Sequence, residues 1–191
     1  MNFDKLFLFD ETDEPATFRV ELGRPFSAFD IVRGVEEPPR SLCFRRCVGR
    51  YVFDVIGTGS PELLLLSCRV LQVLRDSRVT GWKSFPVEIR GSKGEPIRGY
   101  EGLIVTGRCG AVDWSMGKYA RMPPRIPSSN PYDAWIGMYF DPESWDGSDL
   151  FMPEGTAYII AVERVKTAVE QAEITNVRFK PLTEFERSWP S

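Results

Sequence analysis

The sequence predicts an α+β fold, in which short and mostly antiparallel strands accompany two main helices. Three observations lead to this prediction. Most apolar segments are short and end at glycine or proline, as strands do. Only two segments have the periodicity of an amphipathic helix. Those segments also share one pattern, since "VTGWKSFPV" at 79–87 and "ITNVRFKPL" at 174–182 lie 95 positions apart and follow similar runs. We expect one domain over residues 1–191, which the repeat would divide into halves of about 1–95 and 96–191.

The first copy of the pattern predicts a strand, a helix and a second strand. Leu63 to Leu66 suit a short buried strand, and Ser67 stands at the N-cap position of the following helix. Gly81 comes after the helix, where a left-handed backbone is favoured, and Pro86 marks an edge or an irregularity in the strand "WKSFPVEI". The expected inner face of the helix consists of Val70, Val73, Leu74 and Ser77.

The second copy repeats this order. Tyr158 to Ala161 form the apolar run, Val162 replaces the capping Ser67, and Asn176 stands at the position of Gly81. The helix face consists of Val165, Ala168, Val169 and Ala172, and identical pairs are Arg69 and Arg164, Val70 and Val165, Thr80 and Thr175, Pro86 and Pro181, with Asp54 and Asp149 upstream. We therefore expect two superposable strand–helix–strand units about a pseudo-twofold axis, with helices starting near residues 68 and 163.

Further strands are expected outside these units. "KLFLFD" and "TFRVELG" predict two early strands joined by the acidic turn "ETDEPA". "GRYVFDVIG", "PIRGYEGLIVTG", "GAVDWSMG" and "WIGMYFD" predict strands as well. "PPRSLCFRR" predicts a loop that leads into a short element. Residues 122–135, with four prolines, predict an irregular segment, and "TEFERSWPS" predicts a polar tail on the surface.

Composition and charge are those of a folded globular protein, with 42% hydrophobic and 27% charged residues. No run approaches the roughly 18 consecutive apolar residues of a membrane helix. The start "MNFDKLFLFDETDE" lacks the basic region of a secretory signal, so we expect a cytoplasmic protein. Acids outnumber bases nine to four in residues 1–38 and eleven to five in 127–191, whereas bases lead fifteen to seven in 39–126. These segments either neutralise one another or turn one sign towards a partner.

The chain contains no histidine, which removes the commonest general base, the serine and cysteine triads and most catalytic zinc sites. Carboxylate, lysine or tyrosine chemistry remains open. Cys43 and Cys47 in "CFRRC" form half of a metal or redox pattern, but the missing second pair favours reduced thiols. We expect no enzyme activity, no cofactor and no metal.

Four other patterns have a chemical and a simpler interpretation. The backbone amides of "GTGS" at 57–60 could bind a phosphate, but the segment lacks the lysine of a Walker motif. We therefore expect a turn there. "DPESWDGSD" crowds carboxylates without the spacing of an EF-hand, and it predicts a solvated acidic loop. Asp113 in "AVDWS" predicts a strand-end turn rather than a binding residue. The basic and aromatic residues at 45–53 resemble those of a nucleic-acid-binding surface. The acidic net charge of −3 argues against this function and favours a basic loop beside a strand.

Several phrases follow one another in an order typical of one family. They are "DVI" with its turn, "LLSCRVLQVLRDSRVTGWKSFPVEI", "YEGLIVTGRCGAVDWSMGKY" and "DLFMPEGTAYIIAVERVKTAVEQAEITNVRFKPLTEF", which span residues 50 to 186. The residues that carry the match are Ser67, Arg69, Pro86, Asp113, Phe151, Val177, Phe179 and Pro181, while "AVER" departs from a clearer "SER" in the second copy. In this order the chain resembles the immunity proteins of bacterial polymorphic-toxin systems, in the family numbered eleven of that series. The resemblance implies a single immunity-type domain that binds and neutralises a cognate protein toxin in the cytoplasm and brings no catalytic residues.

A toxin-binding surface would combine aromatic anchors with a polar rim. The acidic turn at 10–14 and the region from 132 to 146 offer both, and they could imitate the substrate of a toxin with a basic cleft. The competing interpretation makes these aromatics core residues beside solvated loops. The candidate toxin-binding residues are Asp10, Glu11, Tyr132, Asp133, Trp135, Asp141, Trp145 and Asp146.

Other functions and partners stay open or are set aside at this point. The alternative to the immunity role is a small histidine-independent enzyme with carboxylates or arginines in a groove between the two halves. A third hypothesis is a scaffold or a nucleic-acid-associated module. We expect a protein partner rather than nucleic acid or membrane, and the oligomeric state is open.

Overall fold

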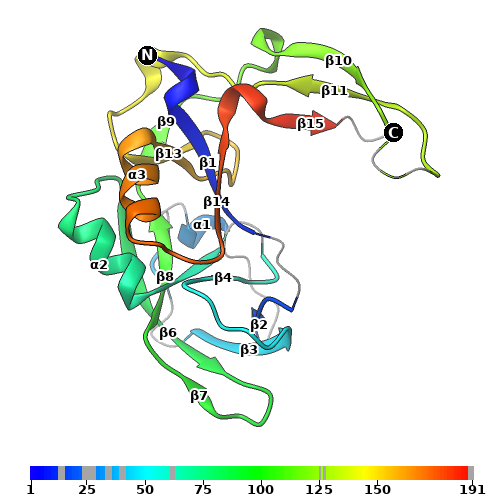
Figure 1. Cartoon of the computed structure of the whole chain (residues 1–191). Coiled ribbons are helices and arrows are strands. Elements are labelled where there is room, and N and C mark those ends of the chain that lie inside the picture. Colours follow the sequence, from blue (N-terminus) through cyan, green and yellow to red (C-terminus); the bar gives the residue numbers. More distant parts are fainter. Residues whose placement is uncertain are drawn as a thin grey trace.

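The computed structural model describes residues 1–12, 16–22, 29–32, 36–38, 42–60, 63–124, 126 and 128–188. It confirms a mixed α+β fold, in which strands dominate and form three sheets (Figure 1). Within these residues, two strand pairs run parallel, β3 with β6 and β9 with β12, and the other pairs run antiparallel.

One sheet has five strands in the order β14-β1-β13-β12-β9. Its members are β1 (Leu6–Glu11), β9 (Gly107–Cys109), β12 (Leu150–Pro153), β13 (Ile160–Val162) and β14 (Val177–Pro181). The first strand of the chain therefore lies between two strands that come from its end.

The second sheet has the order β2-β3-β6-β8-β5-β4, with β7 beside β6. Its members are β2 (Arg19–Leu22), β3 (Leu42–Val48), β4 (Val55–Gly57), β5 (Leu64–Ser67), β6 (Trp82–Arg90), β7 (Pro96–Ile97) and β8 (Tyr100–Val105). Trp82 to Pro86 pair with β8, whereas the pairing of β6 with β3 begins at Val87. Pro86, which has no backbone N–H to donate, thus stands where β6 gains its second neighbour.

The third sheet, which we call the arm, has the order β10-β11-β15. Its strands are β10 (Lys118–Met122), β11 (Tyr132–Ile136) and β15 (Glu186–Ser188). Figure 1 shows the arm extending away from the rest of the protein. Short 3-10 helices flank the sheets at η1 (Phe3–Lys5), η2 (Trp114–Met116), η3 (Pro142–Ser144) and η4 (Leu182–Glu184).

The two nine-residue helices α2 (Cys68–Asp76) and α3 (Glu163–Gln171) contact each other, and α1 (Phe29–Val32) is a single turn. Both long helices start where the sequence predicts. The Ser67 hydroxyl accepts a hydrogen bond from the Val70 amide at 3.3 Å, whereas Val162 provides no side-chain cap. Gly81 and Asn176 have φ of +83° and +59°, which confirms the expected left-handed positions.

Four strands of each large sheet have equivalent pairings. Val55 lies opposite Leu66, and Leu150, 95 positions later, lies opposite Ala161. Trp82 lies opposite Val105 in the same way that Val177 lies opposite Glu11. The set β4-β5-β8-β6 therefore matches β12-β13-β1-β14 strand for strand. In this match β1 takes the place of β8, so each of the two matched four-strand sets contains one strand from the other half of the chain.

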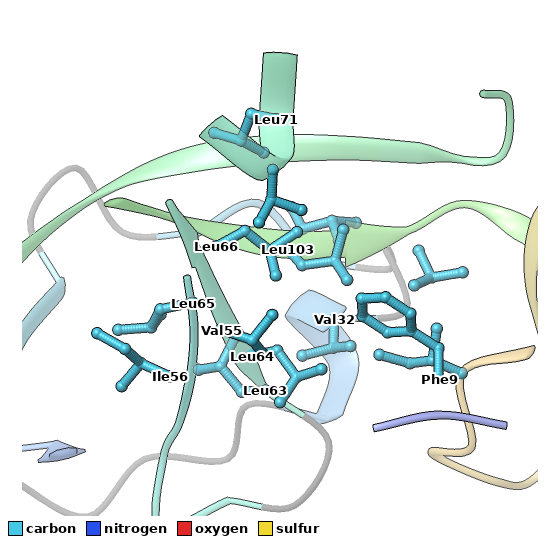
Figure 2. Packing of buried hydrophobic residues seen from close by; sticks show 14 of the residues in the cluster. Phe9, Val32, Val55, Ile56, Leu63, Leu64, Leu65, Leu66, Leu71 and Leu103 are labelled. Carbon is cyan, nitrogen blue, oxygen red and sulfur yellow. The ribbon is translucent and has the colours of Figure 1, made fainter. Parts of the chain in front are cut away.

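The larger of two core clusters joins both large sheets and both long helices. Figure 2 shows Leu63 to Leu66, Val55 and Leu103 packed together near Phe9 of β1 and Leu71 of α2. The four consecutive leucines are all buried, as the apolar run predicts for an interior strand. A second cluster, which includes Phe140, Phe151, Leu182 and Phe185, lies where the arm joins the protein.

Several local predictions are wrong. The element that follows the loop in "PPRSLCFRR" is longer than the short one expected, because it is the seven-residue strand β3, which pairs with both β2 and β6. The strand expected in "WIGMYFD" lies earlier, at Tyr132–Ile136, because Gly137 with φ of +99° ends it. Trp114–Met116 form a 3-10 turn instead of a strand. Residues 183–188 of the expected surface tail belong to the fold, since Phe185 is buried and β15 pairs with β11, and residues 189–191 lie outside the described residues.

Candidate functional site

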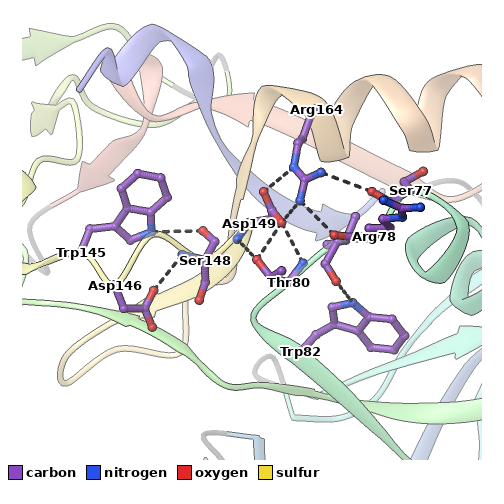
Figure 3. Close-up of polar contacts among 10 residues, drawn as sticks. Ser77, Arg78, Thr80, Trp82, Trp145, Asp146, Ser148, Asp149 and Arg164 are labelled. Atoms are coloured by element: carbon purple, nitrogen blue, oxygen red, sulfur yellow. Dashed lines mark hydrogen bonds and ion pairs between the residues drawn. The ribbon is translucent and has the colours of Figure 1, made fainter.

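The junction between the two halves contains a buried carboxylate, Asp149 (Figure 3). Asp149 accepts hydrogen bonds from the Thr80 amide and hydroxyl, both at 2.7 Å. Arg164 forms a two-pronged ion pair with the same carboxylate and also donates to the carbonyls of Ser77 and Arg78. Asp149 and Arg164 belong to the second half, and their other partners belong to the first, so the cluster ties the halves together.

The equivalent residues form a second cluster with the halves exchanged. Asp54 accepts from the amide and hydroxyl of Thr175 at 3.0 and 2.9 Å, and from the Ser67 hydroxyl at 2.8 Å. Arg69 contacts Asp54 at 3.3 Å and donates to the carbonyl of Ala172, the residue equivalent to Ser77. We call these two clusters the paired Asp–Arg latches.

The hydrogen bonds of the latches control the ionisation of their carboxylates. Burial alone would raise the pKa of Asp149, but hydrogen bonds from Arg164 and Thr80 outweigh it and hold the pKa below its usual value. The pKa of Asp54 is likewise lowered, because hydrogen bonds from Thr175 and Ser67 and the Arg69 charge outweigh burial. Both carboxylates are therefore stable anions whose oxygens already have partners, which suits a structural role better than acid–base catalysis.

Exposed apolar side chains point to the arm as a contact surface. Met116, Tyr119 and Ile126, all on or beside β10, are 57 to 59% exposed. The strand register places Tyr119, Arg121, Asp133, Trp135 and Arg187 on one face of the arm. We call these five residues the arm face.

Side chains on the arm face form two contacts across neighbouring strands. The rings of Tyr119 and Trp135 meet edge to face with centroids 5.4 Å apart, and they border a hollow of about 340 Å³. Arg121 pairs with Asp133 at 2.8 Å, and this hydrogen bond holds the pKa of Asp133 below its usual value. The arm face thus offers tyrosine, tryptophan and arginine, which are residue types enriched at protein interfaces, together with one acidic residue.

A larger hollow of about 490 Å³ lies at the base of the arm, and we call it the root pocket. Leu8 and Asp10 of β1 and Tyr158 line it from the five-stranded sheet and its β12–β13 loop, and Trp114 and Arg187 line it from the arm side. The Arg187 guanidinium lies 4.4 Å from the centre of the Trp114 ring. Pocket and arm face meet at Arg187.

The structure does not gather the eight predicted site residues in one place. Asp10 and Glu11 lie on β1, where Asp10 pairs with Arg178 and Glu11 pairs with Arg19, both at 3.1 Å. The rest of the acidic turn at 10–14 includes Asp13 and Glu14, which lie outside the described residues.

Of the residues predicted on the second segment, Asp133 and Trp135 share the arm face. Tyr132 lies on the same strand but on the opposite side, where its hydroxyl donates to Glu186 at 2.7 Å. All three belong to strand β11 and not to the irregular segment or loop in which the sequence places them.

The remaining three predicted residues lie before β12 and support local structure. Asp141 caps η3 by accepting from the Glu143 amide at 3.0 Å, and Asp146 accepts from the Arg108 and Ser148 amides at 2.8 and 2.9 Å. Trp145 packs against Phe151 with ring centroids 5.5 Å apart and donates to the Ser148 carbonyl (Figure 3). Trp145 is thus a core-flanking aromatic, the competing interpretation that the sequence allows.

The sequence prediction missed Tyr119 and Arg187, and it assigned Trp114 to a turn at the end of a strand rather than to a binding site. In "GKYARM", Tyr119 and Arg121 are separated by one small residue, Ala120, and this spacing is a weak signal for one face of a half-exposed strand. Nothing in the sequence indicates that Arg187, 52 residues after Trp135, becomes its cross-strand neighbour.

Comparison of the chain with protein-family models and with curated proteins gives no match. Among the described residues, no three histidine, cysteine or acidic side chains come together as a metal site. The same part of the chain includes no helix that is long and apolar enough to span a membrane.

Proposed function

We propose that this chain is a non-catalytic immunity protein, which binds a cognate toxin of a bacterial polymorphic-toxin system and neutralises it in the cytoplasm. The proposal rests on the resemblance in the order of sequence phrases and on the absence of histidine. The observation that carries it is the arm face, where Tyr119 and Trp135 lie beside the Arg121–Asp133 pair on a sheet that extends from the protein.

The contact chemistry of the arm face agrees with a protein partner. Tyrosine, tryptophan and arginine are the residues that most often dominate binding energy at protein interfaces. A stable interface buries on the order of 800 Å² on each partner, so the toxin would also cover exposed neighbours such as Met116 and Ile126. Asp133 is the acidic residue that this surface offers to a basic toxin cleft, whereas Asp141 and Asp146 cap turns elsewhere.

Co-expression with the toxin encoded beside this chain tests the proposal. Wild-type protein should restore growth and bind the toxin, whereas Tyr119→Ala/Trp135→Ala should weaken binding about 100-fold or more without lowering the thermal unfolding midpoint by more than a few degrees.

The chain provides a matched control in Val48→Ala/Tyr51→Ala. Val48 and Tyr51 belong to a second exposed patch, where they are 54 and 50% exposed, and this variant should protect as well as wild type. Protection by the arm variant but not by the control would move the interface to residues 48–52. Failure of the wild-type protein to protect against any neighbouring toxin would contradict the immunity function itself.

One observation favours the alternative of a histidine-independent enzyme. Asp10, Glu11 and Arg178 line a hollow of about 200 Å³ together with Thr58 and Ser60 of the first half. This hollow contains the carboxylates and the arginine that a histidine-independent enzyme would need in a groove between the two halves. Because these carboxylates are already ion-paired with Arg178 and Arg19, we place this function second.

We also propose that the halves 1–95 and 96–191 arose by duplication of one unit with the order strand, strand, strand, helix, strand. The equivalent strand registers and the paired Asp–Arg latches support this origin. An exchange of residues 77–80 and 172–175 tests it, with Gly81 and Asn176 left in place because a Cβ atom at Gly81 would lie 2.0 Å from the Leu150 carbonyl oxygen. A chain with exchanged turns should still unfold cooperatively, and a chain that no longer folds would count against equivalence.

A further inference from the structure

The root pocket has the size and lining of a small-molecule site. Its volume of about 490 Å³ falls within the range of roughly 300–1,000 Å³ that is usual for ligand pockets. Leu8, Leu64 and Trp114 give it apolar walls, and Tyr158 and Arg187 add polar groups. The walls come from both halves of the chain and from the arm, so the pocket exists only in the complete fold.

Arg187 supplies a cation whose hydrogen-bonding edge is available. Its guanidinium stacks on Trp114, with Cζ 4.4 Å from the ring centre. Stacking occupies the flat face of a guanidinium and leaves the N–H groups in its plane free to bind. Within the described part of the chain, the Arg187 guanidinium makes no ion pair with a carboxylate and no hydrogen bond, and the Tyr158 hydroxyl makes no hydrogen bond.

The charge balance of the pocket favours an anion. Asp10 is the acidic residue in the lining, and Arg178 already pairs with it at 3.1 Å. Among the described residues that line the pocket, the charge that remains without an oppositely charged partner is therefore the positive charge of Arg187. A guanidinium fork and a carboxylate match in geometry and form two parallel hydrogen bonds.

We propose that the root pocket binds a small carboxylate with an aromatic or branched apolar body. The carboxylate lies on the Arg187 fork, and the apolar body lies among Leu8, Leu64 and Trp114. Such a group comes either from a free organic acid or from the C-terminal residue of a peptide. This site goes beyond toxin neutralisation and does not depend on it.

Titration of the full-length protein with four probes tests the proposal by calorimetry. Phenylacetate should bind with a saturable signal, phenylacetamide at least about tenfold more weakly, and 2-phenylethylamine without measurable affinity. Glycyl-glycyl-phenylalanine with a free C-terminus separates the two sources. Tighter binding of this peptide than of phenylacetate would identify a peptide C-terminus, and weaker binding would identify a free acid.

Arg187→Gln should weaken phenylacetate binding at least about tenfold, while Arg75→Gln should leave it unchanged. Arg75 is a matched control, because it also lies over a tryptophan, Trp82, at 6.0 Å but does not line the pocket. The comparison of acid with amide uses the wild-type protein, so it holds even where a variant folds poorly. Equal binding of acid and amide, tighter binding of the amine, or no saturable binding of either acid would overturn the proposal.

Discussion

Asp54 and Asp149 perform the same task at two positions that lie 95 residues apart. Each carboxylate accepts hydrogen bonds from the amide and the hydroxyl of a threonine in the other half of the chain, and each pairs with an arginine that is the second residue of a helix. The two arginines then reach the carbonyls at the end of the opposite helix, where cations are favourable. The identities at Asp, Arg and Thr in the sequence repeat therefore reflect one set of contacts made twice.

Asp149→Asn should lower the free energy of unfolding by about 2–3 kcal/mol at pH 7, because it removes the charged acceptor of Arg164 and Thr80. The effect should depend on pH. The folded-state pKa of Asp149 is lowered, so its contribution is complete above its unfolded pKa of about 4 and is lost as the pH falls through the folded value. Urea unfolding at pH 7 and at about pH 3 should show the gap between variant and wild type narrowing in acid.

Asp76→Asn is the control for this measurement. Asp76 is exposed and accepts from Gln72 one turn earlier, so its substitution should change stability by less than about 0.5 kcal/mol. Asp54→Asn should follow the pH dependence of Asp149→Asn, since both pKa values are lowered for the same reason. A gap that stays constant down to pH 3 would contradict the linkage of the latches to ionised carboxylates.

At the level of elements, the strongest local signals are the ends of the two long helices. Gly81 and Asn176 lie in left-handed conformations because the chain must turn back there towards β6 and β14. Gly81 has an additional constraint, since a Cβ atom at this position would lie 2.0 Å from the Leu150 carbonyl oxygen. Asn176 instead uses its side chain, whose amide donates to the Val55 carbonyl at 2.7 Å.

Gly81→Val should destabilise the protein by at least about 2 kcal/mol, the sum of left-handed strain and overpacking against β12. Gly94→Val separates these two costs. Gly94 has a similar φ of +80° but open space around its Cβ position, so the variant should lose only the strain of about 1–2 kcal/mol. Chemical denaturation of both variants measures the difference, and equal losses would show that the close approach to Leu150 costs nothing.

Elements with a strong local pattern could be predicted from the sequence, and elements defined by distant partners could not. α2 and α3 follow from the spacing of Val70 and Leu74, and of Val165 and Val169. β3 and β15 have weak patterns of their own and become strands because β6 and β11 lie beside them. The same limitation applies to the arm face, where Asp133 and Trp135 were predicted but their neighbours Tyr119 and Arg187 depend on pairing.

For the whole molecule, the exchange of β1 and β8 has the largest consequence. β8 comes from the second half but lies between β5 and β6 of the first, and β1 lies between β13 and β14. Without its exchanged strand, each sheet would lose hydrogen bonds on two inner edges and expose buried side chains such as Leu103 or Phe9. We therefore expect that residues 1–95 and 96–191 are not two independent folding units.

Separate expression of residues 1–95 and 96–191 tests this consequence. Each fragment alone should lack a cooperative thermal transition in far-UV circular dichroism, because it lacks the central strand of its own sheet. An equimolar mixture should recover the spectrum and the single transition of the intact chain, with a midpoint that rises with concentration. A cut between Asn130 and Pro131, in the β10–β11 connection, is a comparison for the first fragment, because residues 1–130 keep β8 together with its neighbours β5 and β6. Cooperative unfolding of either isolated half would show that strand exchange is not what joins the two halves.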